Sequence, residues 1–206
     1  MKDWADAISA IARAAGEEIL SVYQRDFEVT EKADASPLTQ ADLAAHRCIV
    51  SRLPELGGDL PVLSEESADM AWSQRRAWSR YWLVDPLDGT REFIKKNGEF
   101  TVNIALIDNG EPVLGVVYAP VMDWLLVGGR GLGAHWHRTG SSGAAVVARA
   151  GNPLRVAASR SHRDPATDAF LASVPHLQVE SVGSSLKFCR IAAGRADLYA
   201  RFGPTM

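Results

Sequence analysis

The six residues Asp85-Pro86-Leu87-Asp88-Gly89-Thr90 lie between the apolar run 81–84 and the run 91–96. This order predicts a buried strand, a tight turn and a short helix. Two carboxylates then stand close together at the carboxyl end of a strand, where α/β proteins bind ligands. Carboxylate and carbonyl oxygens suit Mg²⁺ or Mn²⁺. The N–H groups of a helix that begins near Gly89 and Thr90 suit a phosphate.

Composition indicates an ordinary globular protein. The chain has 206 residues, of which 47% are hydrophobic and 23% are charged, so it can bury a substantial core. No apolar run approaches the roughly 18 residues that cross a bilayer, and the first residues lack a signal-peptide pattern. Cys48 and Cys189 are too few for a disulfide framework. We therefore expect a cytoplasmic protein without a transmembrane segment, and peripheral association with the inner membrane stays open.

Charge is distributed unevenly along the chain. The net charge of −3 argues against a nucleic-acid polymer as partner. Residues 149–206 contain eight Lys or Arg against four Asp or Glu, so residues 1–148 carry a net charge of −7. An acidic part that holds cations beside a basic part that holds phosphates fits a small phosphorylated substrate. Chance clustering of solvated charges would give the same counts.

Hydrophobic spacing predicts helices and strands in mixed order, without a strict βαβ alternation. Helices are expected at 3–24, 39–53, 165–174 and 184–193, and strands at 60–63, 81–84, 100–107, 112–118, 124–127, 154–158 and 196–201. In the second helix, Leu43, Ile49, Val50 and Leu53 are expected to face inward. Asn109-Gly110 between two apolar runs predicts a hairpin. The Gly-, Ser- and Ala-rich residues 138–152 predict a loop that joins an α+β part (1–148) to an α/β part (149–206).

Two motifs are expected to carry no function. Residues 129–134 match the G-x-G-x-x-A pattern of dinucleotide-binding loops, but no helix follows them, so a turn between strands is expected. His135 and His137 alternate on a predicted strand and share a face, where they could bind a metal. Because no third ligand occurs at a recognisable spacing, we expect surface histidines.

Four acidic or basic elements follow one another along the chain: Asp42, Glu65, the 85–90 motif and the basic C-terminal part. A two-metal phosphatase needs such a set, with acidic ligands from several strand ends and a cationic grip on the substrate. The order resembles the Mg²⁺-dependent, lithium-sensitive phosphatases related to inositol monophosphatase. Their D-P-[LI]-D-G-T signature occurs unaltered at 85–90, and residues 64–67 resemble their G-E-E-S motif.

The resemblance covers essentially the whole chain and implies the family's fold and cofactors. The fold is a mixed α/β layered αβαβα sandwich of the inositol monophosphatase and sugar phosphatase type. The cofactor is Mg²⁺, as two or three ions, with Mn²⁺ as an alternative and Li⁺ as an inhibitor. The first part of the chain, residues 1–148, would then be the metal-binding part.

Longer matches point to the 3'(2'),5'-bisphosphate nucleotidase branch of this superfamily. They cover residues 92–103, 159–162, 183–189 and 196–205. The resemblance implies hydrolysis of the 3'-phosphate of 3'-phosphoadenosine 5'-phosphate (PAP) to AMP. The sulfated nucleotide PAPS is a second candidate substrate, which would tie the enzyme to sulfate assimilation. An inositol monophosphatase-like phosphatase and an inactive nucleotide-binding fragment stay as alternatives.

The resemblance also assigns roles to individual residues. Metal ligands would be Glu65, Asp85, Asp88 and the backbone carbonyl of Leu87. Asp42 and Thr90, with Glu65, would orient and help to deprotonate the attacking water. The substrate would be bound by Gly89, Thr90, His162, Ser184, Lys187 and Arg201.

Each assigned residue also has a plain structural interpretation. The 85–90 stretch suits an ordinary turn with a helix cap, because Asp, Pro and Gly are common turn residues. Thr39-x-x-Asp42 is a capping box, and one carboxylate does not easily serve both as cap and as base. Glu65 would suit a solvated strand end, and Lys187 a solvated helix side chain. His162 and Ser184 are ordinary loop and helix-cap residues.

One departure from the family lies at the end of the sequence. Family members continue past G-P-T with a W-D-x-A-A-G motif whose Asp is a further metal ligand, whereas this sequence ends at Met206. The resemblance therefore implies an incomplete C-terminal part. We expect weaker binding of divalent ions and feeble activity in this form. Exposed apolar surface would favour a homodimer.

Overall fold

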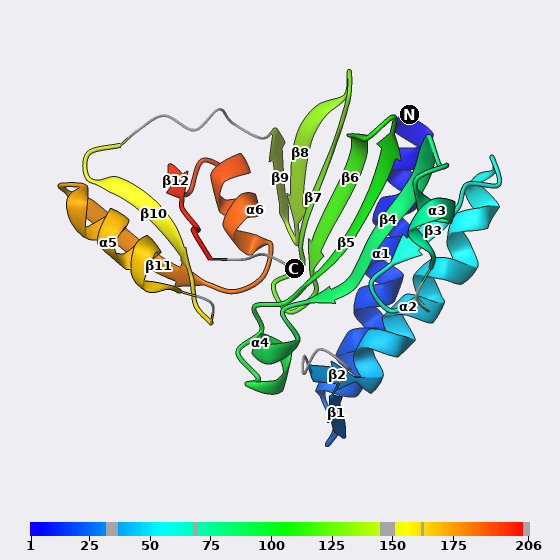
Figure 1. The fold of residues 1–206 in the computed structure, drawn as a ribbon, viewed down its shortest axis with the longest axis horizontal. Helices are drawn as coiled ribbons and strands as arrows, with labels where there is room; N and C mark the ends of the chain where they lie inside the picture. Colours follow the sequence, from blue (N-terminus) through cyan, green and yellow to red (C-terminus); the bar gives the residue numbers. More distant parts are fainter. Residues whose placement is uncertain (32–36, 68–69, 145–150, 162, 204–206) are drawn as a thin grey trace.

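The computed structural model describes residues 1–31, 37–67, 70–144, 151–161 and 163–203. Among these residues the strands form three sheets, and Figure 1 shows helices on both sides of the two larger ones. The helices are α1 (Lys2–Tyr23), α2 (Gln40–Arg52), the 3-10 helix η1 (Leu53–Leu56), α3 (Trp72–Arg75), α4 (Thr90–Ile94), α5 (Pro165–Ser173) and α6 (Leu186–Ala192). The strands are β1 (Val29–Glu31), β2 (Pro37–Thr39), β3 (Val62–Ser64), β4 (Arg80–Asp88), β5 (Thr101–Asp108), β6 (Glu111–Ala119), β7 (Trp124–Gly129), β8 (Gly133–Arg138), β9 (Ser141–Ala144), β10 (Leu154–Ser159), β11 (Leu177–Val182) and β12 (Leu198–Tyr199).

The elements form five layers. The larger sheet has the strand order β3-β4-β5-β6-β7-β8-β9, and its pairs are antiparallel except for the parallel pair of β3 with β4. Helices α1 and α2 cover one face of this sheet, and α6 lies on the other face (Figure 1). The parallel sheet β11-β10-β12 follows beyond α6, with α5 outermost (Figure 1). This arrangement confirms the predicted αβαβα sandwich.

Helix α1 packs on the larger sheet through the apolar stripe that its sequence predicts. Ile8, Ile11 and Ile19 are buried in the core beneath it. The helix approaches the sheet closely at Gly16, where a Cβ atom would lie 2.5 Å from the ring of Tyr118. At the C-terminal end of α1, the ring of Tyr23 packs against the ring of Phe93 in α4. This contact anchors the short helix behind the 85–90 motif to the hydrophobic core.

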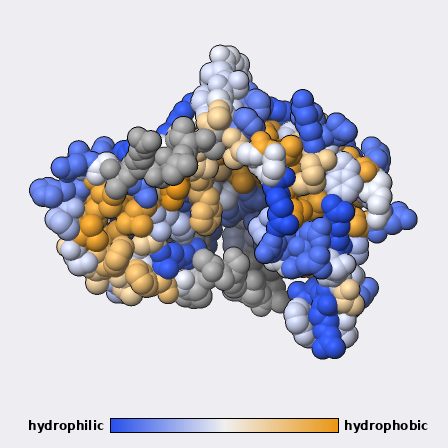
Figure 2. All heavy atoms as spheres, turned by 90° about the horizontal axis from the view of Figure 1, so that it is seen from above, coloured by the Kyte–Doolittle hydropathy of each residue, from blue (hydrophilic) through white to orange (hydrophobic). Residues whose placement is uncertain are grey.

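A second cluster joins the two parts of the chain. Val182, Leu186 and Cys189 pack against Ala119 and Trp124 of the larger sheet. Seen from above, the two parts form two lobes with a hollow between them (Figure 2). Within the described ranges, no helix is both long enough and apolar enough to cross a membrane.

Several local predictions are confirmed. Asn109 and Gly110 have φ angles of 51° and 80° and connect β5 to β6 in a tight hairpin. The Gly-rich residues 129–133 form the turn between β7 and β8. His135 and His137 lie on β8 and are exposed, as expected for surface histidines.

Other local predictions are wrong, and each has a physical reason. The tight turn expected after residue 84 is part of β4, because Asp85 and Asp88 pair with β5 across a shift in register. Leu43 is 37% exposed, since the inward face of α2 is formed by Ala41, Asp42, Ala45 and Ile49. Strand β9 lies within the expected loop 138–152, and β1 and β2 were missed because three residues are too few to show an alternation. Strand β11 was also missed, although Leu177 to Glu180 alternate between apolar and polar residues. The predicted boundary at 148 and 149 lies outside the described residues.

The small sheet is held by an ion pair that gives a pH-dependent prediction. Arg155 donates through its backbone N–H and its guanidinium to Asp197, whose side chain is 1% exposed. These hydrogen bonds lower the pKa of Asp197 to about 2 from its usual 3.8. A depressed carboxyl pKa stabilises the fold above pH 4, and this contribution is lost as the pH falls toward 2.

We therefore expect Asp197→Asn to lower the melting temperature at pH 7, and the difference from the unmodified protein to shrink between pH 4 and pH 2. Thermal unfolding across this range measures it. The control Asp168→Asn, whose carboxylate is 52% exposed beside Arg163, should change the melting temperature little. A difference for Asp197→Asn that stays constant down to pH 2 would contradict the assignment.

Candidate functional site

Parallel pairing of β3 with β4 places Glu65 next to Asp85. Ser64 stands opposite Val84 in the register, and the N–H of Glu65 donates to the carbonyl of Val84 at 3.0 Å. The hydroxyl of Ser64 and Nδ1 of His46 are 2.8 Å apart, which ties the end of β3 to α2. The strand end therefore has a defined place, although the Glu65 residue itself is exposed.

Asp85 lies in an environment that penalises its charge. Burial raises its pKa well above the usual range, and the negative charges of Asp88, Glu65 and Asp42 and a hydrogen bond with Glu65 raise it further. Its Oδ1 atom is buried and has no hydrogen-bond partner among the described residues. A buried carboxylate oxygen of this kind requires a cation or a proton.

Asp88 lies in a mixed environment. Burial raises its pKa, whereas the charge of Lys187 and a hydrogen bond from the backbone N–H of Ser185 oppose the rise, and Glu65 and Glu92 add to it. Asp88 therefore contacts the C-terminal part of the chain as well as the acidic residues of the first part. The predicted metal motif and the predicted substrate-binding part thus meet at this residue.

The donor set suits a hard divalent cation. Glu65, Asp85 and Asp88 offer carboxylate oxygens, and the carbonyl of the buried Leu87 lies between the two aspartates. Within the part of the chain that the structure describes, no group of three or more Asp, Glu, His or Cys side chains is arranged so that it could hold a metal ion.

Asp42 serves two partners at once. Its Oδ2 accepts from the N–H of Thr39 at 2.8 Å and from the Thr39 hydroxyl at 2.6 Å, which completes the capping box of α2. Its Oδ1 accepts from the hydroxyl of Thr90 at 3.2 Å. The two oxygens therefore have different partners: one caps the helix and the other faces Thr90, and the role of Asp42 as a base stays a prediction. Burial raises the pKa of Asp42 despite these hydrogen bonds.

Gly89 occupies a position that a larger residue would disturb. It precedes α4 with φ of 95°, in the left-handed region that favours glycine. A Cβ atom there would lie 3.1 Å from the backbone oxygen of Glu99 and 3.1 Å from Cβ of Ser184. The first turn of α4 therefore lies directly against the residues that precede α6.

The turn before α6 is held by a hydroxyl network that the sequence did not reveal. The hydroxyl of Ser185 lies 2.8 Å from the hydroxyl of Thr101 and donates to Oδ1 of Asn103 at 2.8 Å. These residues fall within the long family matches at 92–103 and 183–189, and those matches were the only sign in the sequence that they matter. Ser184 has φ of 47°, an uncommon value for a residue other than glycine.

Lys187 is buried, so the interpretation as a solvated helix side chain is wrong. Its residue is 6% exposed, and Nζ donates to the carbonyl of Ser184. Burial lowers the pKa of Lys187, the charges of Asp88 and Glu92 raise it, and the charge of Arg201 lowers it. Arg201 thus lies near enough to share this region. His162 lies outside the described residues.

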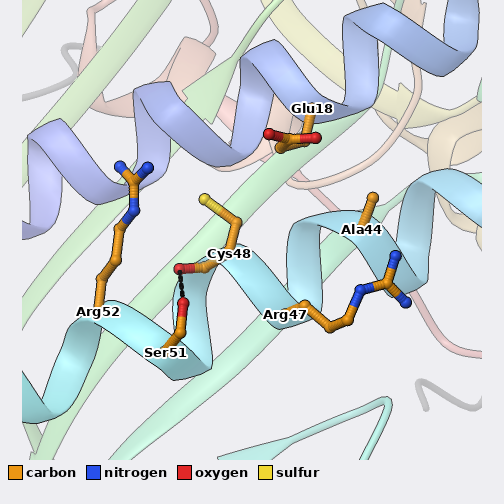
Figure 3. Close-up of a pocket in the computed structure, with 6 residues that line it drawn as sticks. All are labelled: Glu18, Ala44, Arg47, Cys48, Ser51 and Arg52. Carbon is orange, nitrogen blue, oxygen red and sulfur yellow. Dashed lines mark hydrogen bonds between the residues drawn. The ribbon is translucent and has the colours of Figure 1, made fainter.

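A surface pocket lies away from this site. It has a volume of about 280 Å³ and is formed between α1 and α2 by Glu18, Ala44, Arg47, Cys48, Ser51 and Arg52 (Figure 3). Burial raises the pKa of the Cys48 thiol, so the thiolate form is disfavoured. None of the predicted site residues lines this pocket.

Comparison with known proteins identifies the family. The model of the inositol monophosphatase family matches residues 1–206. The 3'(2'),5'-bisphosphate nucleotidase CysQ of Escherichia coli (strain K12) is 50% identical over 202 residues, which cover 97% of this chain and 81% of that protein. CysQ from Bacteroides thetaiotaomicron, whose crystal structure is known, matches with a TM-score of 0.86 and 42% identity, covering 100% of this chain and 82% of that chain. An IMPase from Thermotoga maritima matches with a TM-score of 0.80 and 26% identity, covering 96% and 75%.

Proposed function

Because the chain belongs to the inositol monophosphatase family, we propose that it is a 3'(2'),5'-bisphosphate nucleotidase that hydrolyses the 3'-phosphate of PAP to AMP. PAPS is a second candidate substrate, which would place the enzyme in sulfate assimilation. The reaction consumes one water, breaks the bond between phosphorus and the 3'-oxygen, and releases inorganic phosphate.

One observation of the structure supports this proposal most directly. The half-buried Asp88 interacts with Lys187 and accepts a hydrogen bond from the N–H of Ser185. A phosphate bound beside Asp88 would have the metal-binding carboxylates on one side and the buried ammonium group of Lys187 on the other. A phosphorylated nucleotide, with two separate phosphate groups, would use both sides.

Glu65, Asp85, Asp88 and the carbonyl of Leu87 would hold Mg²⁺. When bound, the metal supplies positive charge that neutralises the phosphate oxygens and activates water for attack. The number of ions, the use of Mn²⁺ and inhibition by Li⁺ are part of the proposal and rest on the family resemblance. The uncompensated charge around Asp85 favours a cation at this position.

Asp42 and Thr90 would orient the attacking water and help to remove its proton. The hydroxyl of Thr90 donates to Oδ1 of Asp42. The oxygen of this hydroxyl can therefore accept a hydrogen bond from the attacking water, while Asp42 accepts the proton that the Thr90 hydroxyl gives up. The capping contacts from Thr39 hold the carboxylate in one orientation. The N–H groups of Gly89 and Thr90 would hold the scissile phosphate.

The remaining predicted residues would bind the rest of the nucleotide. Ser184 and Lys187 come from the turn and helix that meet Asp88, and Arg201 adds positive charge near Lys187. His162 stays a prediction. We also propose a cytoplasmic location, which suits the free thiols of Cys48 and Cys189. A homodimer stays a prediction as well.

Phosphate release from PAP in Mg²⁺ buffer tests the proposed activity. We expect the protein to hydrolyse PAP in the presence of Mg²⁺. In EDTA the rate should fall by at least about 10³-fold, since the metal supplies several kcal/mol of transition-state stabilisation. Addition of excess Mg²⁺ should restore the rate. Inositol 1-phosphate is the comparison substrate, and faster turnover of it than of PAP would favour the inositol phosphatase alternative. PAP binding without turnover in saturating Mg²⁺ would favour the inactive alternative.

A further inference from the structure

Glu99 and Arg160 form an ion pair that joins the two parts of the chain. Glu99 lies between α4 and β5, and Arg160 directly follows β10. The guanidinium donates through Nε to Oε2 at 2.7 Å and through Nη2 to Oε1 at 2.9 Å. Two parallel hydrogen bonds fix both the distance and the angle between the groups. The side chain of Glu99 is 13% exposed, so the pair is partly shielded from solvent.

The same pair holds the segment that leads into α6. The N–H of Gly183 donates to Oε2 of Glu99 at 2.7 Å, and Arg160 donates through Nη2 to the carbonyl of Ser181 at 2.5 Å. Gly183 packs tightly here, because a Cβ atom would lie 2.9 Å from the backbone oxygen of Glu99. Glu99 and Arg160 therefore hold the segment at Ser181 and again at Gly183.

This held segment continues directly into the substrate-binding turn 183–187. Ser184 has φ of 47°, and a residue other than glycine keeps such a conformation only where its surroundings impose it. The turn lies against the start of α4, since a Cβ atom at Gly89 would be 3.1 Å from Cβ of Ser184. The contacts that hold Gly183 fix the turn on the side before Ser184, and the hydroxyl network of Ser185 fixes it on the side after.

We propose that Glu99 is a positioning residue for substrate binding. Acting through Arg160 and Gly183, it sets the separation between the start of α4 and the substrate-binding turn. The inference rests on the proposed function, in which Gly89 binds the scissile phosphate and Lys187 binds the other end of the nucleotide. A substrate that bridges the two groups would lose affinity if the turn moved, whereas the chemistry at Asp42 would be unaffected.

A second ion pair provides a matched control. Arg190 donates through Nη1 to Oε2 of Glu180 at 2.7 Å, and both residues belong to the C-terminal part. Glu180→Gln therefore removes one carboxylate charge and one hydrogen bond near the same segment, from a side chain that is 54% exposed, and it leaves the hydrogen bonds of Glu99 in place. Glu99→Gln keeps the shape of the side chain and removes the charge that holds Arg160.

The full chain with each substitution would be tested in two ways. For Glu99→Gln we expect KM for PAP to rise about tenfold while kcat changes less than about threefold, as loss of a charge-assisted hydrogen bond predicts. Hydrogen–deuterium exchange in the peptide 181–188 should become about tenfold faster without substrate, because that segment opens more readily. Arg160→Gln should reproduce both changes, and the double variant should be little worse than either single variant. Glu180→Gln should show neither change.

The outcomes separate this inference from the proposed function. Unchanged exchange at 181–188 in Glu99→Gln would overturn the inference whatever the enzyme hydrolyses. Faster exchange with an unchanged KM, or equal effects of Glu180→Gln, would also overturn it, because the pair would then have only a structural role. Absence of PAP turnover by the unmodified chain would instead contradict the proposed function, and the exchange measurement would still test whether Glu99 holds the turn.

Discussion

Asp85→Asn is expected to lower the turnover of PAP by about 10³-fold and to stabilise the protein in EDTA. The first effect follows if Asp85 binds the metal ion. The second follows because the charge of Asp85 is penalised by desolvation and by the negative charges of Asp88 and Glu65, and its buried Oδ1 atom has no hydrogen-bond partner among the described residues. A neutral amide removes the penalty on the charge, and we expect a stabilisation of about 1–3 kcal/mol, the usual cost of leaving a buried polar group unsatisfied.

Thermal unfolding with and without Mg²⁺ provides a second measurement that does not require turnover. Mg²⁺ should raise the melting temperature of the unmodified protein, because an ion that binds only the folded state stabilises it. This increase should be lost in Asp85→Asn. Asp108→Asn is the control, since Asp108 lies on the neighbouring strand β5 and is 35% exposed beside Arg80. Turnover within tenfold of the unmodified protein, or a lower melting temperature in EDTA, would contradict the role of Asp85.

Phe93→Ala is expected to destabilise the protein by about 3–5 kcal/mol. Phe93 is fully buried at 0% exposure, and its ring lies 4.7 to 5.2 Å, between centroids, from those of Tyr23, Phe27 and Phe100. Removal of the ring leaves a cavity that this rigid aromatic cluster cannot fill by relaxing. The melting temperature should therefore fall by roughly 6–20 °C for a chain of this size.

The same substitution at Phe188, which is 59% exposed, is the control and should cost far less. Because Phe93 anchors α4 behind the 85–90 motif, Phe93→Ala should also lower activity at temperatures where the protein is still folded. A loss of stability equal to that of Phe188→Ala would show that the aromatic cluster does not hold α4.

Much of the fold could be predicted because its signals are local. The apolar stripe of α1 and the Asn109-Gly110 hairpin depend on residues close together in the chain. The layered architecture followed from the family resemblance and is confirmed. The extent of β4 could not be predicted in this way: it continues through Asp85 and Asp88 because β5 offers partners, and a distant strand leaves no trace in local spacing.

The candidate site divides in the same way. The chemical identity of the metal-binding and phosphate-binding groups is present in the sequence itself, because carboxylates, glycine and threonine in the order found at 85–90 determine which ligands can be bound. That the carboxylates of this stretch bind a metal ion stays a prediction.

Folding across long separations determines how those groups are used. Distant packing buries Lys187, brings Thr90 to the free oxygen of Asp42, and joins Glu99 to Arg160. The physical reason is that burial and hydrogen bonding depend on which segments meet in space, and a stretch of chain does not specify its distant neighbours. Residue types thus follow from the sequence, whereas their charge states, orientations and partners follow from packing.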